Sequence, residues 1–153
     1  MKRLAIIAFA VVTLVACSKN DDTSGNNNGG GTTGSFTWTE NGGGTITADS
    51  AYWTTGTWGT GIRAFKAGIV NYFEINWTGQ NNVSIGAKTF GNGGSFDFIK
   101  SNIFYNVSAG TTAVFNITAF NNNLLTGNFN ITTKNSANAQ IILVGAFTSL
   151  VKK

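Results

Sequence analysis

The chain has 153 residues, with no proline, no histidine, a single cysteine and a formal net charge of +4. Without histidine, the chain lacks the commonest general base and the commonest metal ligand. A single cysteine cannot form an internal disulfide, so stability has to come from an ordinary hydrophobic core. The basic residues are spread along the chain rather than gathered in a stripe, which argues against nucleic acid as a partner.

The first seventeen residues have the features of an export signal. Lys2 and Arg3 form a positive start, residues 4–16 are apolar apart from Thr13, and Cys17 follows Ala16. The apolar run has thirteen residues, fewer than the roughly 20 that cross a bilayer as a helix. A plain secretory signal with an incidental cysteine is the alternative.

This segment resembles the processing site of bacterial lipoproteins. The resemblance implies that residues 1–16 are a signal peptide and that Cys17 becomes the acylated first residue of the mature chain. Two or three acyl chains on one residue give durable membrane anchoring, which a single chain does not.

Residues 17–35 are predicted to be a flexible tether, because Ser, Asn, Asp, Gly and Thr leave nothing there to bury. Asp21 and Asp22 follow the cysteine closely, and this acidic stretch resembles the export signal of surface lipoproteins in the Bacteroidota. The resemblance implies an outer-membrane lipoprotein that faces the exterior. A solvated tether that happens to carry charge is the alternative.

Residues 36–153 form one predicted all-β domain of 118 residues, long enough to bury a core without metal or disulfide. Thr, Asn, Gly, Phe and Ile dominate the domain, a composition typical of short strands joined by tight polar turns. Runs of alternating polar and apolar residues between Gly- and Asn-rich turns predict strands. The predicted strands are 36–39, 45–48, 52–55, 62–67, 69–78, 88–90, 95–99, 103–107, 115–119, 125–132 and 140–151.

Two of these runs predict a hairpin with a defined register. If its turn centres on Asn122, the inward residues meet in pairs: Phe115 with Phe129, Ile117 with Gly127 and Ala119 with Leu125. A second hairpin is predicted around Gly68, with Ile69, Phe73, Ile75 and Trp77 on one face.

The last run is apolar on both faces at Ile141, Ile142, Leu143 and Val144, which favours a strand in the middle of a sheet. Many short strands with frequent turns predict a single antiparallel β-sandwich or a closed barrel. The strand Leu125-Thr126-Gly127-Asn128-Phe129 and the closing Gly145-Ala146-Phe147 resemble those of small uncharacterised β-sandwich surface lipoproteins of the Bacteroidota. That resemblance implies a fold and a cell-surface location, but no chemistry.

The domain has four carboxylates: Glu40, Asp49, Glu74 and Asp97. A glycosidase needs two carboxylates about 5–10 Å apart, and no local spacing argues for such a pair. Glu74 is expected to be solvated on the polar face of its strand. The sequence has neither a clustered acidic calcium motif nor a phosphate-binding loop, so we expect no metal and no cofactor.

The most suggestive group is aromatic: Tyr52, Trp53 and Trp58, the last in a Gly-rich segment. Flat rings beside small residues can stack on a sugar, while Asn and Thr supply hydrogen bonds to its hydroxyls. The alternative is that these rings fill the end of the core, because Trp is usually mostly buried.

Asp49-Ser50-Ala51 resembles the O-glycosylation acceptor of exported Bacteroidota proteins, which implies a glycan on Ser50 in an exposed turn. The alternative is an ordinary turn in which Asp49 bonds backbone N–H groups two residues on.

Three function classes follow. The first is a non-catalytic surface module for binding or adhesion, with a glycan or a surface protein as partner. The second is a structural or coat lipoprotein without a specific ligand. The third is a carboxylate-pair glycoside hydrolase. An exposed aromatic cluster favours the first class, a buried one favours the second, and two carboxylates in one cleft favour the third.

Overall fold

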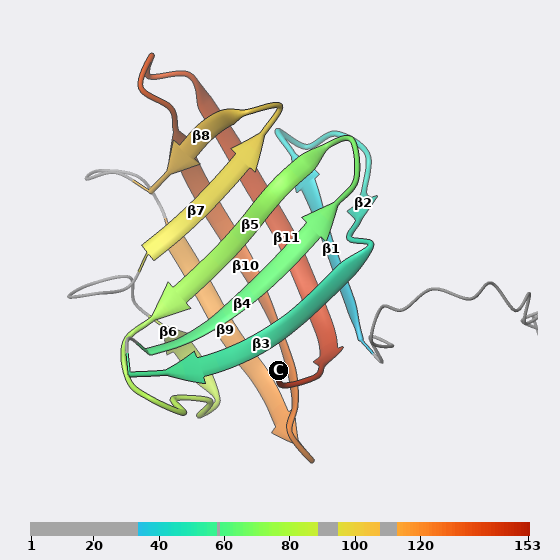
Figure 1. Ribbon diagram of the computed structural model, residues 1–153, viewed down its shortest axis with the longest axis vertical. Coiled ribbons are helices and arrows are strands. Elements are labelled where there is room, and N and C mark those ends of the chain that lie inside the picture. The colour runs from blue at the N-terminus through green and yellow to red at the C-terminus, as the bar shows by residue number, and fades with distance from the viewer. Residues whose placement is uncertain (1–33, 58, 89–94, 108–112) are drawn as a thin grey trace, which may run out of the picture.

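The computed structural model describes residues 34–57, 59–88, 95–107 and 113–153. Cys17, Asp21, Asp22 and Trp58 lie outside these ranges. The described residues form strands and turns, and no helix occurs among them. The described part of the chain therefore contains no helix that could span a membrane. The fold is all-β, as predicted (Figure 1).

Eleven strands make up one sheet, which is antiparallel throughout its named strands. They are β1 (Ser35–Glu40), β2 (Ile46–Thr47), β3 (Ser50–Gly56), β4 (Gly59–Lys66), β5 (Val70–Trp77), β6 (Gly86–Lys88), β7 (Ser95–Lys100), β8 (Ile103–Asn106), β9 (Ala113–Asn121), β10 (Leu124–Lys134) and β11 (Gln140–Leu150). The order across the sheet is β2-β1-β11-β10-β8-β7-β5-β4-β3, while β9 pairs with β10 and β6. Ser35, expected to end the tether, is the first residue of β1.

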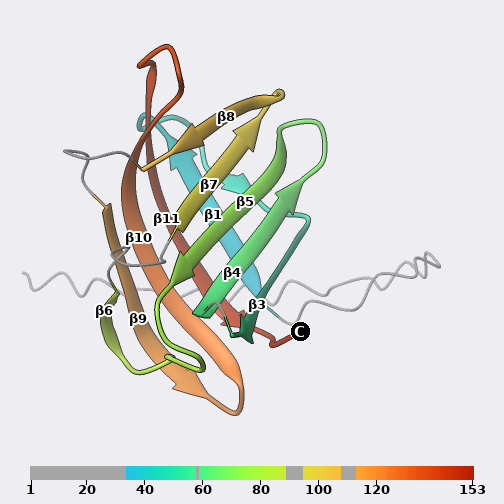
Figure 2. The ribbon, with the colours of Figure 1, turned by 60° about the vertical axis from the view of Figure 1, so that its left-hand side comes forward.

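The sheet curls into a half-barrel with two walls that face each other across the core (Figure 2). We call β3, β4, β5, β7 and β8 the front wall, and β2, β1, β11, β10, β9 and β6 the back wall. Among the described residues, the walls join between β8 and β10 through one residue pair, Asn106 with Lys134. On the other side the C-terminal residues reach β3. Trp53 N–H donates to Val151 O over 3.0 Å, and Lys153 N–H donates to Trp53 O over 2.9 Å.

Aromatic rings from both walls fill the core. Phe36 of the back wall lies edge-on to Phe73 of the front wall, with ring centroids 4.9 Å apart, and stacks on Phe129 at 5.4 Å. Phe115 stacks on Phe147 at 5.5 Å and lies 4.9 Å from Trp77. Ring pairs of this kind add stability beyond the area that they bury.

The β9–β10 hairpin has the predicted register over part of its length. Phe115 pairs with Phe129 and Ile117 pairs with Gly127, which confirms the prediction for these pairs. The prediction is wrong for Ala119, which pairs with Thr126 and is exposed, because the register shifts at Thr126–Gly127. This bulge inserts one extra residue into β9 and turns Phe120, rather than Ala119, toward Leu125 and the core.

The turn of this hairpin also explains the shift. Asn122 and Asn123 have φ angles of 50° and 61°, so both central residues are left-handed, as in the tight two-residue turn that fits twisted strands. That turn pairs Asn121 with Leu124. A turn centred on Asn122 would instead pair Asn121 with Asn123. The bulge reconciles this tight turn with the Phe115–Phe129 pairing.

The two other packing predictions have different outcomes. Phe73, Ile75 and Trp77 are buried on one face of β5, as predicted, while Ile69 lies in the preceding turn and packs against the core from there. β11 is a middle strand between β1 and β10, which is also confirmed. Its outer face is not covered, however, because Ile142 and Val144 are exposed.

Candidate functional site

The predicted aromatic group does not form one surface cluster. Tyr52 and Trp53 are neighbours in β3 and point to opposite faces, so Tyr52 lies half-buried on the outer surface and Trp53 lies in the core at 1% exposure. Trp53 Nε1–H donates to Asn123 O over 3.0 Å, which ties β3 to the β9–β10 turn. Trp53 therefore follows the core-filling alternative, and its ring is not available to a ligand.

The outer surface of the front wall carries a different aromatic feature, which we call the apolar row. It consists of Phe65, Tyr72, Ile99 and Phe104. Tyr72 pairs with Ile99, and Ile99 pairs with Phe104. The register shift after Ala64 sets Phe65 beside Tyr72, and both line one depression. Phe65 and Phe104, at the two ends of the row, are 45% and 47% exposed.

A second line of residues, the polar row, runs beside the apolar row. Successive Cα pairs join its six members: Tyr52, Arg63, Glu74, Asp97, Asn106 and Lys134. Six strands at about 4.8 Å spacing make a row roughly 24 Å long. The row starts on β3, crosses the front wall and ends on β10 of the back wall, where the walls join (Figure 1).

Glu74 in the middle of the polar row is buried, contrary to the prediction that it is solvated. Its exposed fraction is 7% because neighbouring side chains cover it. Arg63 Nε–H donates to Glu74 Oε1 over 2.8 Å, and the Tyr72 hydroxyl donates to Glu74 Oε2. Sequence alternation placed Glu74 on the outer face correctly, but it could not show that larger cross-strand neighbours would shield the carboxylate.

The charges of the polar row shift each other's pKa values. Burial alone would lower the pKa of Arg63, but Glu74, followed by Tyr52, holds that pKa above its usual value. Burial, with the negative charge of Glu74 as the second cause, raises the pKa of Asp97. Glu74 and Asp97 are directly paired across β5 and β7, which brings the charge of Glu74 close to the Asp97 carboxylate.

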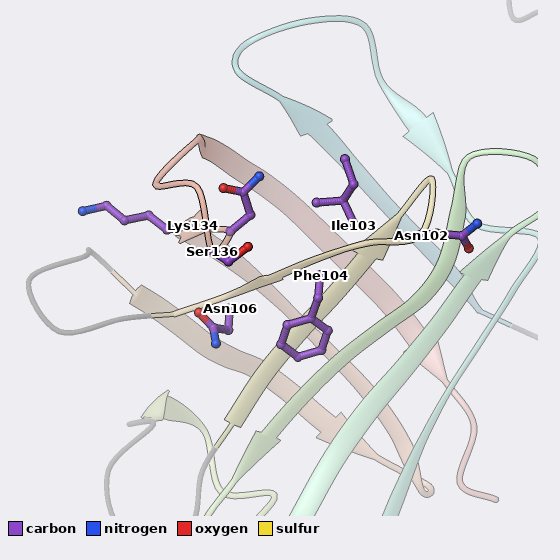
Figure 3. Close-up of a pocket in the computed structure, with 7 residues that line it drawn as sticks. Asn102, Ile103, Phe104, Asn106, Lys134 and Ser136 are labelled. Atoms are coloured by element: carbon purple, nitrogen blue, oxygen red, sulfur yellow. The ribbon is translucent and has the colours of Figure 1, made fainter.

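A depression lies at each end of this surface. One, of about 300 Å³, is lined by Ser50, Tyr52, Arg63, Ala64, Phe65 and Tyr72. The other, of about 450 Å³, lies where the walls join and is lined by Asn102, Ile103, Phe104, Asn106, Lys134, Asn135 and Ser136. Figure 3 shows that Ile103 and Phe104 leave β8 in opposite directions and that Lys134 extends away from the strands. Both sizes fall at the small end of ligand sites in proteins.

The apolar row, the polar row and the two depressions together form the candidate site. Phe65, Tyr52 and Arg63 line the first depression, and Phe104, Asn106 and Lys134 line the second. Both rows therefore connect one depression to the other. We call this whole surface the front face.

The other two carboxylates are occupied in ion pairs away from the polar row. Glu40 accepts a hydrogen bond from Lys100 Nζ. Asp49 accepts hydrogen bonds from Lys66 Nζ at 2.5 Å and Ala67 N–H at 2.8 Å. The turn alternative expected Asp49 to bond a backbone group two residues further on. Asp49 instead bonds the β4–β5 turn. Ser50 is the first residue of β3 and is half-buried, rather than exposed in a turn.

The hydrolase alternative needs two carboxylates in one cleft. Glu74 and Asp97 are neighbours, but neither carboxylate lines either depression among the described residues. Glu74 is also engaged by Arg63 and Tyr72. Within residues 34–57, 59–88, 95–107 and 113–153, no three potential metal ligands come together.

The site residues predicted from the sequence do not include Phe65, Tyr72, Ile99 and Phe104. Each lies next to a core residue in its strand (Ala64, Phe73, Phe98 and Tyr105), so strict alternation would have placed it on the outer surface. The signal was present, but apolar residues invite assignment to the core. Only the pairing of β4, β5, β7 and β8 shows that these four side chains lie in one row.

Comparison of the chain with protein-family models, with curated proteins and with solved structures finds no match. The function therefore has to be argued from the geometry of the front face.

Proposed function

We propose that the chain is a lipid-anchored surface protein that binds carbohydrate, without catalysis, through the front face. The observation that carries the proposal is the apolar row, which is exposed at Phe65 and Phe104 and half-buried between them. This row lies directly beside a row of hydrogen-bonding side chains. A sugar ring has an apolar C–H face and a rim of hydroxyl groups. Aromatic rings pack against the first, and polar side chains bond the second.

The two rows supply both kinds of contact over a long, open surface. Phe65, Tyr72 and Phe104 offer rings, while Arg63 and Asn106 offer N–H donors on the adjoining row. An open face of this length suits several units of an extended chain better than one small molecule, which would need an enclosing pocket. An extended glycan therefore fits the shape of the front face.

The anchor is the other half of the proposal. Lys2, Arg3, the apolar residues 4–16 and Cys17 support lipidation, and Asp21 with Asp22 supports display on the outer face of the outer membrane. A Gly- and Asn-rich tether would let the domain turn the front face toward a ligand. Cys17→Ser should release the protein from membranes, and membrane fractionation of the native host would measure this. Retention of the variant in the membrane would contradict the anchor.

Binding should be tested on a glycan array with the purified full chain and its variants. Phe65→Ala and Phe104→Ala should each lower the affinity, since each removes a ring from one end of the apolar row. Val144→Ala is the matched control, because Val144 is 45% exposed on the outer face of the back wall. Thermal unfolding of all variants would show that the folded state persists.

Three outcomes separate the function classes. Glycan binding that Phe65→Ala and Phe104→Ala weaken and Val144→Ala does not would support the proposal. Absence of binding to every glycan would favour a structural or coat lipoprotein. Release of sugars from a bound glycan, lost on Asp97→Asn, would favour the carboxylate-pair hydrolase.

A further inference from the structure

The second depression, where the front and back walls join, differs in charge from the rest of the front face. It is lined by Asn102, Ile103, Phe104, Asn106, Lys134, Asn135 and Ser136. Its described lining therefore has one positive charge and no negative charge. By contrast, the middle of the polar row holds Arg63 together with Glu74 and Asp97.

Lys134 has no carboxylate partner among the described residues. The ion pairs found there are Arg63 with Glu74, Lys66 with Asp49 and Lys100 with Glu40. Asp97 is the nearest carboxylate in the polar row, but Asn106 lies between it and Lys134. Two strand spacings put the Asp97 and Lys134 backbones about 10 Å apart. The ion pairs of the described residues do not include one between these two side chains.

Two of the neighbouring polar side chains are also open to a ligand. Asn106 and Ser136 have no side-chain hydrogen bond within the described part of the chain, whereas Asn135 is used by its own turn, where it accepts from Ala137 N–H and Ala139 N–H at 2.9 Å. The Asn106 amide, the Ser136 hydroxyl and the Lys134 side chain thus line the depression, and Phe104 brings the apolar row to its edge. The flexible four-carbon stem of Lys134 lets its ammonium group reach a ligand seated there.

We propose that this depression binds the carboxylate of an acidic sugar unit, such as a uronic acid, within the glycan. The inference rests on the proposed function and names the class of glycan. Lys134 would pair with the sugar carboxylate, Asn106 and Ser136 would bond its oxygens, and Phe104 would pack on the ring. A charge-assisted hydrogen bond is about twice as strong as a neutral one, so the acidic unit gains more than a neutral sugar from this lining.

The test compares two polymers with the same sugar backbone: polygalacturonate, whose carboxylates are charged, and its methyl ester, whose carboxyl groups are neutral. Calorimetric titration of the full chain should give tighter binding to polygalacturonate, and the difference should shrink as salt concentration rises. Lys134→Gln should weaken binding to polygalacturonate about tenfold and leave binding to the methyl ester unchanged. Lys134→Arg should keep most of the affinity, because it keeps the charge.

Lys152→Gln is the control for net charge. Lys152 is exposed at the C-terminus, 3.3 Å from Asn81 Oδ1 and over the Trp53 ring, away from this depression. The variant removes the same charge and should leave both affinities unchanged. An equal loss with Lys152→Gln and Lys134→Gln would overturn the inference, because it would show that overall charge alone attracts the polymer.

Failure of this inference can be told from failure of the proposed function. Equal affinity for both polymers, unaffected by Lys134→Gln but lowered by Phe65→Ala, would overturn the acidic-sugar site and leave carbohydrate binding in place. Absence of binding to either polymer and to every glycan on the array would overturn both.

Discussion

Gly127 of β10 lies directly opposite Phe147 of β11, and in the same pair of strands Gly145 of β11 lies opposite Phe129 of β10. A Cβ atom on either glycine would overlap the phenyl ring of its partner and a backbone oxygen of the strand on its other side. Each ring therefore lies over the bare backbone of the neighbouring strand. The repeated Gly-x-Phe pattern of the two strands has a packing cause, in which each glycine makes room for the other strand's ring.

Gly127→Ala should therefore destabilise the fold. The added methyl group would meet the Phe147 ring and the Asn116 carbonyl oxygen, and overpacking of this kind costs about 1–3 kcal/mol. Gly44→Ala is the control, because a Cβ at Gly44 would meet nothing within 4 Å. Denaturant unfolding of both variants measures the difference. Equal stability of the two variants would show that the Phe147 ring can move aside without cost.

Phe129→Ala should cost more than any exposed aromatic substitution. Phe129 is buried, stacks on Phe36 at 5.4 Å and lies 5.5 Å from Phe73, so its loss leaves a cavity between the walls. Removal of a core phenylalanine typically costs about 3–5 kcal/mol. Phe65→Ala is the matched comparison, because Phe65 lies on the front face. A cost for Phe129→Ala below about 1 kcal/mol would contradict its place in the core.

Much of the fold could be predicted because most of the strands bury one face. Phe115 and Phe129 were paired correctly from alternation and an assumed turn at Asn122, since a one-residue slip of either strand would have turned its apolar side chains outward. Alternation carries no information about an inserted residue, so the bulge and the exposure of Ala119 could not be foreseen. Asn122 and Asn123 both have a left-handed backbone, which defines the two-residue turn. Predicting the turn correctly would have required knowing this conformation.

The candidate site was less predictable, because it depends on which strands are neighbours. Phe65 and Phe104 are thirty-nine positions apart in sequence and belong to one row only because β4, β5, β7 and β8 lie side by side. The prediction that Glu74 is solvated was wrong for the same reason. Its burial comes from Arg63 on the next strand and Tyr72 two residues earlier, which shield it together.

Glycosylation of Ser50 remains a prediction with a clear measurement. The structure places Ser50 half-buried at the start of β3, in the lining of the first depression, so a glycan there would occupy one end of the front face. Protein from the native host should then have a mass above that of the lipidated chain, and Ser50→Ala should remove the excess. A native mass equal to chain plus lipid would exclude the modification.

The stability of the protein should depend on pH in opposite ways at Asp97 and Asp49. Burial and the charge of Glu74 raise the pKa of Asp97 above its ordinary value of 3.8. Between the ordinary and the raised pKa the folded chain binds more protons at this site than the unfolded chain. The free energy of unfolding therefore falls as pH rises through that window. Asp97→Asn removes this loss, so the variant should gain stability relative to the parent as pH rises from 3.8 through the raised pKa of Asp97.

Asp49→Asn is the control with the opposite sign. The hydrogen bonds from Lys66 and Ala67 lower the pKa of Asp49, so its contribution is present above 3.8 and disappears as pH falls through the lowered value. The variant should be less stable than the parent at pH 7 and approach it in strong acid. Urea unfolding of the parent and both variants across this pH range measures the two slopes. If Asp97→Asn followed the same trend as Asp49→Asn, Asp97 would be stabilised in its charged form, and the repulsion between Glu74 and Asp97 on the front face would be absent.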